Sequence, residues 1–136
     1  MKNADSSAGD SGKKPPQDIA ERTFEFAVRV IQLCVKLDER PGVGRVLMSQ
    51  IWRAGTSVPA NVEEAQAAQS KADFVSKMSI ALKEARETHL RLRLLAPAEV
   101  IPTEKLKPPI QEADEIKRVI GAIIVSTKRG GVGPFF

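Results

Sequence analysis

The chain contains few residue types that carry out chemistry: its 136 residues include one histidine, His89, and one cysteine, Cys34. A Ser–His–Asp or Cys–His arrangement would have to use His89, and no motif around Cys34 or Ser57 marks a nucleophile. Di-iron helix bundles need Glu-x-x-His pairs, whereas the residue three positions before His89 is Arg86. Phosphate-binding and dinucleotide fingerprints do not occur. The sequence therefore predicts a protein that is not an enzyme and has no catalytic, metal or cofactor-binding residues.

The lone histidine and cysteine have structural interpretations. Cys34 lies between Leu33 and Val35, which predicts a small buried apolar residue. We interpret His89 as a surface or helix-packing residue. A single cysteine favours a reducing compartment, and no apolar run is long enough to span a membrane. We therefore expect a cytoplasmic protein without membrane contact.

Polar side chains recur every three or four residues in the first half of the chain. The set consists of Gln50, Arg53, Ser57, Asn61 and Glu64. On a helix this spacing forms a stripe beside the apolar one, and Asn61 also falls on the apolar stripe, which predicts a buried or half-buried, hydrogen-bonded amide. Arg53 and Glu64 are roughly 16 Å apart along a straight helix, so they need partners elsewhere. Either the stripe is a hydrogen-bond network that fixes helix register, or it contacts a ligand or RNA.

A second candidate set is basic and follows in the next helical segment. Its members are Lys77, Lys83, Arg86, Arg91 and Arg93. Glu84 and Glu87 interrupt the set, and Glu87 precedes Arg91 by four residues, a favourable helical pair. The net charge of +4 permits contact with nucleic acid. The set is either a solvated helix face or a phosphate-binding strip. No aromatic residue interleaves it, so base stacking is not indicated.

Helical spacing of apolar residues predicts four helices that hold these side chains. They span about residues 18–38, 43–68 and 70–96, and a fourth segment ends near Lys128. The fourth begins either with Thr103 as a cap or with Pro108-Pro109 in its first turn. Because the links are short, consecutive helices should be antiparallel. The predicted fold is all-α, an antiparallel up-down four-helix bundle over residues 18–129, between a disordered tail at 1–17 and a loose tail at 130–136.

Local signals refine these helices. Asp18 and the sequence Ser70-Lys71-Ala72-Asp73 predict capped starts for the first and third helices. Pro59 lacks an N–H, so we expect a kink near Gly55–Ser57, with a break into two helices as the lesser alternative. Ile31 is expected to widen the core stripe of the first helix, and Ile123 to end that of the fourth.

The second and third helical segments resemble a known family. The stretch Gln50–Ala65 resembles the signature of the four-helix-bundle proteins encoded in intervening sequences of bacterial 23S rRNA genes, approximately Q-x-x-R-A-x-x-S-I-x-x-N-I-A-E-G. Ser70, Phe74, Ser79–Thr88 and Glu112–Ile116 continue the resemblance, which covers roughly residues 20–128. By position, the signature's polar residues are the stripe from Gln50 to Glu64.

The sequence also departs from the family pattern. Ala65 stands where the signature has glycine, which suggests a plain continuing helix. Residues 67–69 are Ala-Ala-Gln where the family has a Gly-Arg stretch. The lost basic residue weakens any phosphate site at that helix end.

The resemblance implies a four-helix bundle that assembles into a ring-like homopentamer. It extends to the accessory variability proteins of diversity-generating retroelements, which are basic pentamers that bind a reverse transcriptase and nucleic acid. We therefore predict a non-catalytic oligomeric bundle that binds RNA or DNA, or a nucleic-acid-processing protein. The alternative is a structural protein–protein interaction scaffold with no nucleic-acid role. A third hypothesis, an enzyme or a small-ligand receptor, requires Arg53, Asn61 and Glu64 to converge on a cavity.

Overall fold

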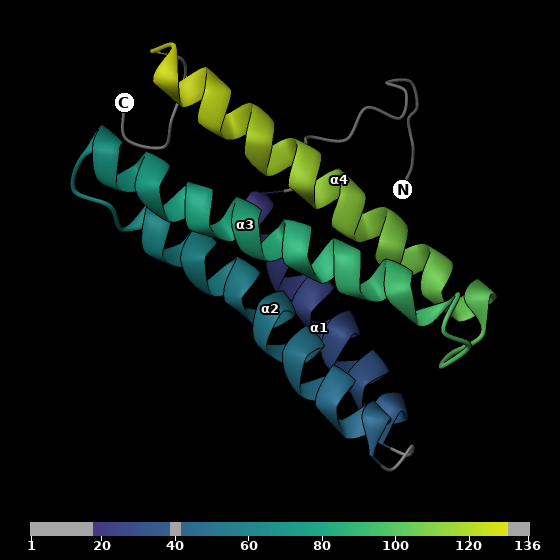
Figure 1. The fold of residues 1–136 in the computed structure, drawn as a ribbon. Coiled ribbons are helices and arrows are strands. Elements are labelled where there is room, and N and C mark those ends of the chain that lie inside the picture. The colour runs from purple at the N-terminus through teal and green to yellow at the C-terminus, as the bar shows by residue number, and fades with distance from the viewer. Residues whose placement is uncertain (1–17, 39–41, 131–136) are drawn as a thin grey trace, which may run out of the picture.

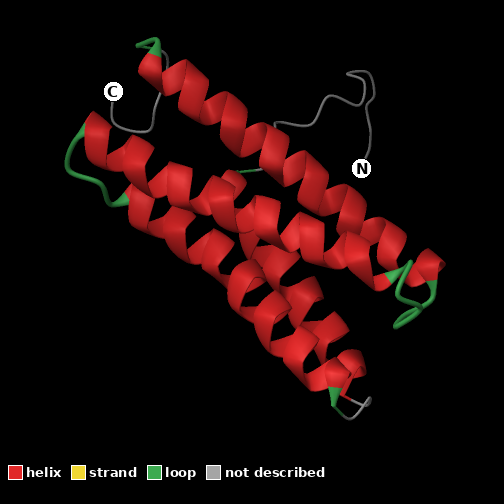
Figure 2. Ribbon diagram, in the orientation of Figure 1, coloured by secondary structure: helices red, strands yellow, loops and turns green. Residues whose placement is uncertain are grey.

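The computed structural model describes residues 18–38 and 42–130, which form four helices joined by short links (Figures 1 and 2). They are α1 (Ile19–Asp38), α2 (Val43–Gln66), α3 (Lys71–Leu95) and α4 (Thr103–Lys128), and no strand occurs in the described residues. The predicted all-α four-helix bundle is confirmed. The tails predicted at 1–17 and 130–136 lie outside the described residues, except for Gly130.

Each helix packs against its neighbour in sequence, and α1 closes the bundle against α4 through a sparser seam. In Figure 1, α3 lies between α2 and α4, and α1 lies behind α2 and α3. Within these helices α1 has no close backbone approach to α3, so the two are diagonal partners. None of the four helices combines the length and apolar composition that crossing a membrane requires.

The core is built by the predicted apolar stripes. In α3 the whole heptad series is buried: Phe74, Met78, Ala81, Ala85, Thr88, Leu92 and Leu95. Phe26, Val30 and Leu37 of α1 and Ile116 and Ile120 of α4 are fully buried in the same core cluster. Cys34 is 4% exposed, and burial raises the pKa of its thiol to about 11. Cys34 is therefore a packing residue, as predicted.

Helix ends follow the predicted caps at two of three places. The Asp18 carboxylate accepts from the Ala20 N–H at 3.3 Å, and the Ser70 hydroxyl accepts from the Asp73 N–H at 3.0 Å. The fourth helix does begin at Thr103, but Pro102 precedes it and no side chain caps it. Neither predicted start is fully correct.

Two consecutive prolines lie within α4. Pro108 and Pro109 lie inside α4 and not in its first turn. Their missing N–H groups leave the carbonyls of Glu104 and Lys105 without intrahelical donors. Both of these residues are exposed, so water can satisfy the carbonyls.

Helix α2 is continuous through Pro59, which excludes the break into two helices. Gly55 has a role that the sequence does not reveal. A Cβ atom at Gly55 would lie 2.8 Å from Val30 Cγ1 on α1, closer than carbon atoms pack. Gly55 therefore lets α1 and α2 approach each other.

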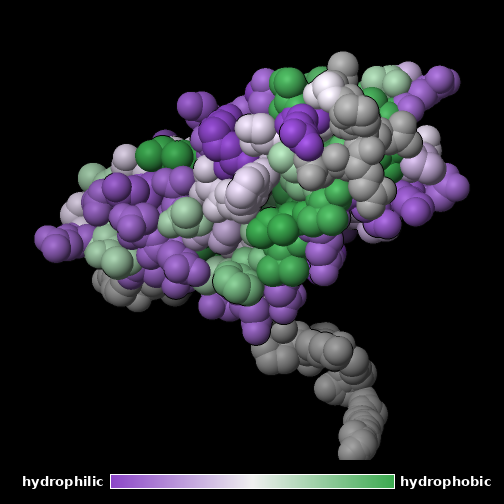
Figure 3. Space-filling model, turned by 90° about the horizontal axis from the view of Figure 1, so that it is seen from below, coloured by the Kyte–Doolittle hydropathy of each residue, from purple (hydrophilic) through white to green (hydrophobic). Residues whose placement is uncertain are grey.

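One expectation about the core is wrong, and a second is confirmed only in part, because Ile123 packs against the core without being fully buried. Ile31 is 42% exposed, because it lies on the outer face of α1, away from Val30 and Leu33. Ile123 is half-buried, and the stripe of α4 ends instead at buried Ile124, four residues after Ile120. Exposed apolar side chains form a visible patch on one face of the molecule (Figure 3).

Candidate functional site

The N-terminal members of the polar stripe on α2, Gln50 and Arg53, face α3. Arg53 Nη2 donates to Glu87 Oε2 at 2.8 Å, and its Nη1 lies 3.6 Å from Glu84 Oε1. One turn earlier, Gln50 Oε1 accepts from Arg91 Nη1 at 2.8 Å. Arg91 in turn pairs with Glu87 within α3, and this hydrogen bond lowers the pKa of the Glu87 carboxyl. Gln50 and Arg53 therefore fix the register of α2 against α3 through hydrogen bonds to Arg91 and Glu87.

Further along the stripe, Ser57 and Asn61 form hydrogen bonds within α2. The Ser57 hydroxyl donates to the Arg53 carbonyl at 2.6 Å, and Asn61 Nδ2 donates to the Ser57 carbonyl at 2.8 Å. Asn61 is half-buried, as predicted, whereas Glu64 is exposed. Because Arg53, Asn61 and Glu64 do not converge, the small-ligand hypothesis is not supported. The stripe is better explained as a network that fixes register.

Glu84 is a member of this network that sequence reasoning missed. Only 8% of the residue is exposed, and its Oε1 has no hydrogen-bond donor among the described residues. Arg53 is the cation beside it. Glu84 directly precedes buried Ala85, and this position on the edge of the heptad stripe was the available signal.

The basic set of α3 does not form one strip, which corrects the prediction. Arg91 faces α2, whereas Arg86 and Arg93 line a cavity of about 480 Å³ beside α4. Lys83 is exposed and Lys77 half-buried, and neither lines the cavity. The reason is helical geometry: residues 86 and 93 are two turns apart on one face, and residue 91 lies on another.

This cavity, which we call the basic pocket, gathers cations from two helices. Its lining residues are Leu82, Arg86, His89, Arg93, Lys117, Arg118 and Gly121. Asp114 pairs with Lys117 at 3.3 Å and with Arg118 at 3.0 Å, and these hydrogen bonds lower the pKa of the Asp114 carboxyl. The excess of positive charge suits an anionic ligand. Sequence reasoning missed the α4 cations, although their i, i+3 and i, i+4 spacing from Asp114 was visible.

His89 forms one wall of the basic pocket. Its Nδ1 lies 3.4 Å from Lys117 Nζ and its Nε2 lies 4.0 Å from Asp114 Oδ1. Because an ammonium group can only donate, Nδ1 is the acceptor in the assigned neutral tautomer. Burial lowers the pKa of His89, the charges of Lys117 and Arg93 add to this effect, and Asp114 opposes it.

We expect His89→Gln to remove part of the pH dependence of stability. The unfolded imidazole titrates near a pKa of about 6.5, and the folded one titrates lower. Between the two values the unfolded state binds more protons, so stability falls as the pH drops through that window and then levels off. Urea unfolding at a series of pH values should show this decline in the wild type and a flatter profile in the variant. Identical stability–pH profiles in the wild type and the variant would contradict the lowered pKa of His89.

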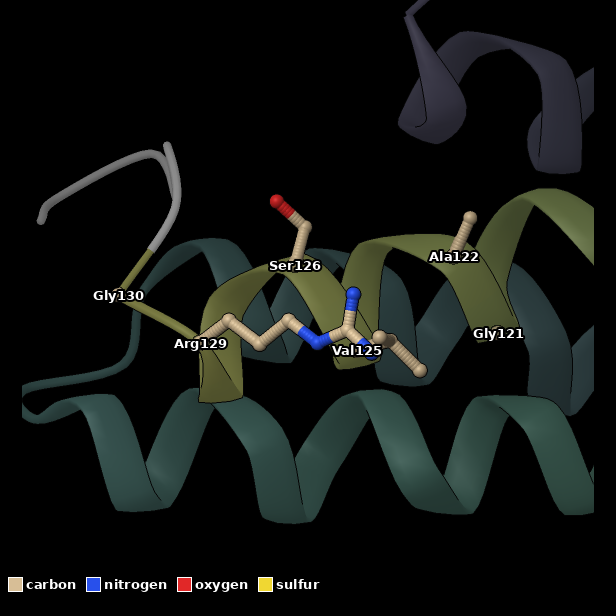
Figure 4. A pocket seen from close by; sticks show the side chains of 6 residues that line it. All are labelled: Gly121, Ala122, Val125, Ser126, Arg129 and Gly130. Carbon is tan, nitrogen blue, oxygen red and sulfur yellow. The ribbon is translucent and has the colours of Figure 1, made fainter.

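A second, shallower cavity of about 540 Å³ continues along the C-terminal part of α4 (Figure 4). Gly121 lines both cavities, and Arg129 lines the far end of the second one. In Figure 4 the Arg129 side chain lies back along the helix toward Val125. From Lys117 to Arg129 the helix rises by about 18 Å, the axial length of about five phosphates in one nucleic-acid strand.

The fold and this surface define a class: an all-α four-helix bundle with a basic groove between its last two helices. A family profile described as "23S rRNA-intervening sequence protein" matches residues 16–122. The chain belongs to this family, as the resemblance of its second and third helices predicted.

One similar solved structure is a protein of unknown function from the S23 ribosomal protein family of Bacteroides thetaiotaomicron. The two chains are 39% identical with a TM-score of 0.73, and the similarity covers 79% of this chain and 98% of that one. The search of curated proteins finds no match.

Proposed function

We propose that this protein is a non-catalytic, oligomeric four-helix bundle that binds the phosphate backbone of nucleic acid through the basic pocket. The observation that carries the proposal is the convergence of Arg86 and Arg93 from α3 with Lys117 and Arg118 from α4. Asp114 neutralises part of this charge. The remaining excess faces an open groove that Arg129 extends.

The pocket suits backbone contacts better than base recognition. Among the described residues no Phe, Tyr or Trp side chain lines it, and its one aromatic ring is the imidazole of His89, so it offers little surface for base stacking. Guanidinium groups form bidentate pairs with phosphate, and Arg118 is exposed enough to reach a ligand. We therefore expect binding with little sequence preference and strong dependence on salt.

The test is fluorescence anisotropy with labelled short RNA and DNA oligonucleotides over a salt series. Arg86→Gln/Arg93→Gln should weaken binding by about tenfold or more and reduce the slope of log K against log salt by about two, since two phosphate contacts are lost.

The matched control is Lys77→Gln/Lys83→Gln, which removes the same charge from α3 outside the pocket. This control should bind nearly as well as the wild type. Equal losses in both variants would indicate a diffuse charge effect. No binding by the wild type at low salt would favour the alternative, a protein–protein interaction scaffold with no nucleic-acid role.

The proposal includes self-association, for which the family resemblance supplies the expectation of a ring-like homopentamer. A partner enzyme that processes nucleic acid remains part of the same proposal, because an acidic protein surface would also complement the basic pocket. Light scattering on the purified protein measures the subunit number directly.

A further inference from the structure

The outer face of α1 is apolar. Phe24, Val28, Ile31 and Val35 are between 41% and 61% exposed. Their spacing of four, three and four residues places them along one stripe, opposite the buried stripe that includes Val30. A surface helix of a monomeric protein usually has one apolar face, whereas α1 has two.

Trp52 of α2 extends this stripe into a patch. The side chain is 50% exposed, and it borders a cavity of about 210 Å³ together with Ile31, Val35, Cys34 and Met48. We call Phe24, Val28, Ile31, Val35 and Trp52 the first patch. Half-exposed Phe and Trp side chains each leave on the order of 100 Å² of apolar surface in water.

A second patch lies on the α3 side of the bundle. Leu90 and Leu94 of α3 are 48% and 56% exposed, and Val46 of α2 is 59% exposed. The hydrogen bond between Gln50 and Arg91 fixes the antiparallel register. Val46 is one turn before Gln50, which places it at the level of Leu94. These three residues form the second patch.

The two patches face different directions. Because α1 and α3 are diagonal partners in the bundle, their outer faces point away from each other, and the two patches lie on either side of α2. An isologous contact between two first patches would leave every second patch in water. A head-to-tail contact covers both patches and continues from copy to copy, and it closes into a ring where the rotation between copies allows closure.

We propose that the first patch of one copy binds the second patch of another copy of this chain. By helical spacing, Glu21 and Glu25 flank the apolar stripe of α1, whereas Lys83 and Arg93 flank that of α3, so acidic residues of one edge can meet basic residues of the other. Specific interfaces bury about 800 Å² per partner, with an apolar centre and a polar rim. The patches supply such a centre and the flanking charges its rim.

This inference rests on the self-association proposed above and assigns the surfaces that produce it. The test measures mass by light scattering for Val28→Lys/Val35→Lys and for Leu90→Lys/Leu94→Lys. Each variant alone should fall to the mass of one chain. Mixed in equal amounts, they should form a dimer and nothing larger, because only one intact pair of patches remains. The control, Val125→Lys, changes an apolar residue of similar exposure outside both patches and should keep the wild-type mass.

Other outcomes overturn the inference in distinguishable ways. A monomeric wild type would overturn self-association as a whole, without affecting nucleic-acid binding by the basic pocket. Wild-type mass in both variants would overturn only the assignment of surfaces. Loss of mass in the α1 variant alone would indicate an isologous contact. Circular dichroism checks folding, and Val28→Ser/Val35→Ser provides a milder version should the lysines unfold α1.

Discussion

Replacing Gly55 by leucine is expected to lower the free energy of unfolding by about 3 kcal/mol, at the upper end of the range for overpacking. A Cβ atom alone would lie 2.8 Å from Val30 Cγ1, and leucine adds three more carbon atoms at the same place. Either α1 moves away from α2 or both side chains leave their preferred rotamers. Thermal unfolding should show a fall in melting temperature on the order of 10–20 °C.

Gly121 is the matched control. It also lies inside a helix, but nothing is within 4 Å of the Cβ atom it lacks. Gly121→Ala should therefore raise stability by about 0.5–1 kcal/mol, the difference in helix propensity. If Gly55→Leu melted at the wild-type temperature, the close approach of α1 and α2 at this position would be wrong.

Replacing Arg53 by methionine is expected to cost about 2 kcal/mol. Arg53 is the cation beside Glu84, whose carboxylate is nearly buried and has an oxygen without a hydrogen bond. Removing one partner leaves a charge in a poorly solvated place. The full cost of a buried pair does not apply, because 57% of the Arg53 side chain is exposed. Urea unfolding measures the difference.

An exposed ion pair gives the comparison. Arg118 pairs with Asp114 at 3.0 Å with 75% of its side chain exposed, so Arg118→Met should change stability by less than about 0.5 kcal/mol. The double variant Arg53→Met/Glu84→Met should recover most of the loss, since an apolar pair can replace a buried ion pair. Equal losses in the double variant and in Arg53→Met would show that Glu84 is not the cause.

The bundle could be predicted from sequence because its signals are local. The Ser70 cap and the heptad series beginning at Phe74 depend only on spacing within α3, and both are confirmed. The packing role of Gly55 could not be predicted, because its contact with Val30 depends on how two helices approach each other. No spacing rule within one helix contains that information.

The candidate site was less predictable for the same reason. The predicted basic set contains Arg86 and Arg93, which line the pocket, but also Arg91, which faces another helix. The cations Lys117 and Arg118 on the other side of the pocket were missed, because they line it only when α4 has one particular orientation about its own axis. That orientation is set by the packing of the whole core and not by any motif near the pocket.

The sparse seam between α1 and α4 also has a kinetic consequence. Every other helix contact joins neighbours in sequence, whereas the hydrogen bonds from Arg22 to Glu112 span 90 residues. Helical proteins rich in local contacts fold in microseconds to milliseconds, because little chain must be ordered before each contact forms. During synthesis, the α1–α2 hairpin can assemble before α4 exists. The pairing of Arg22 must wait for α4, so the α1–α4 seam cannot close before the last helix has been made.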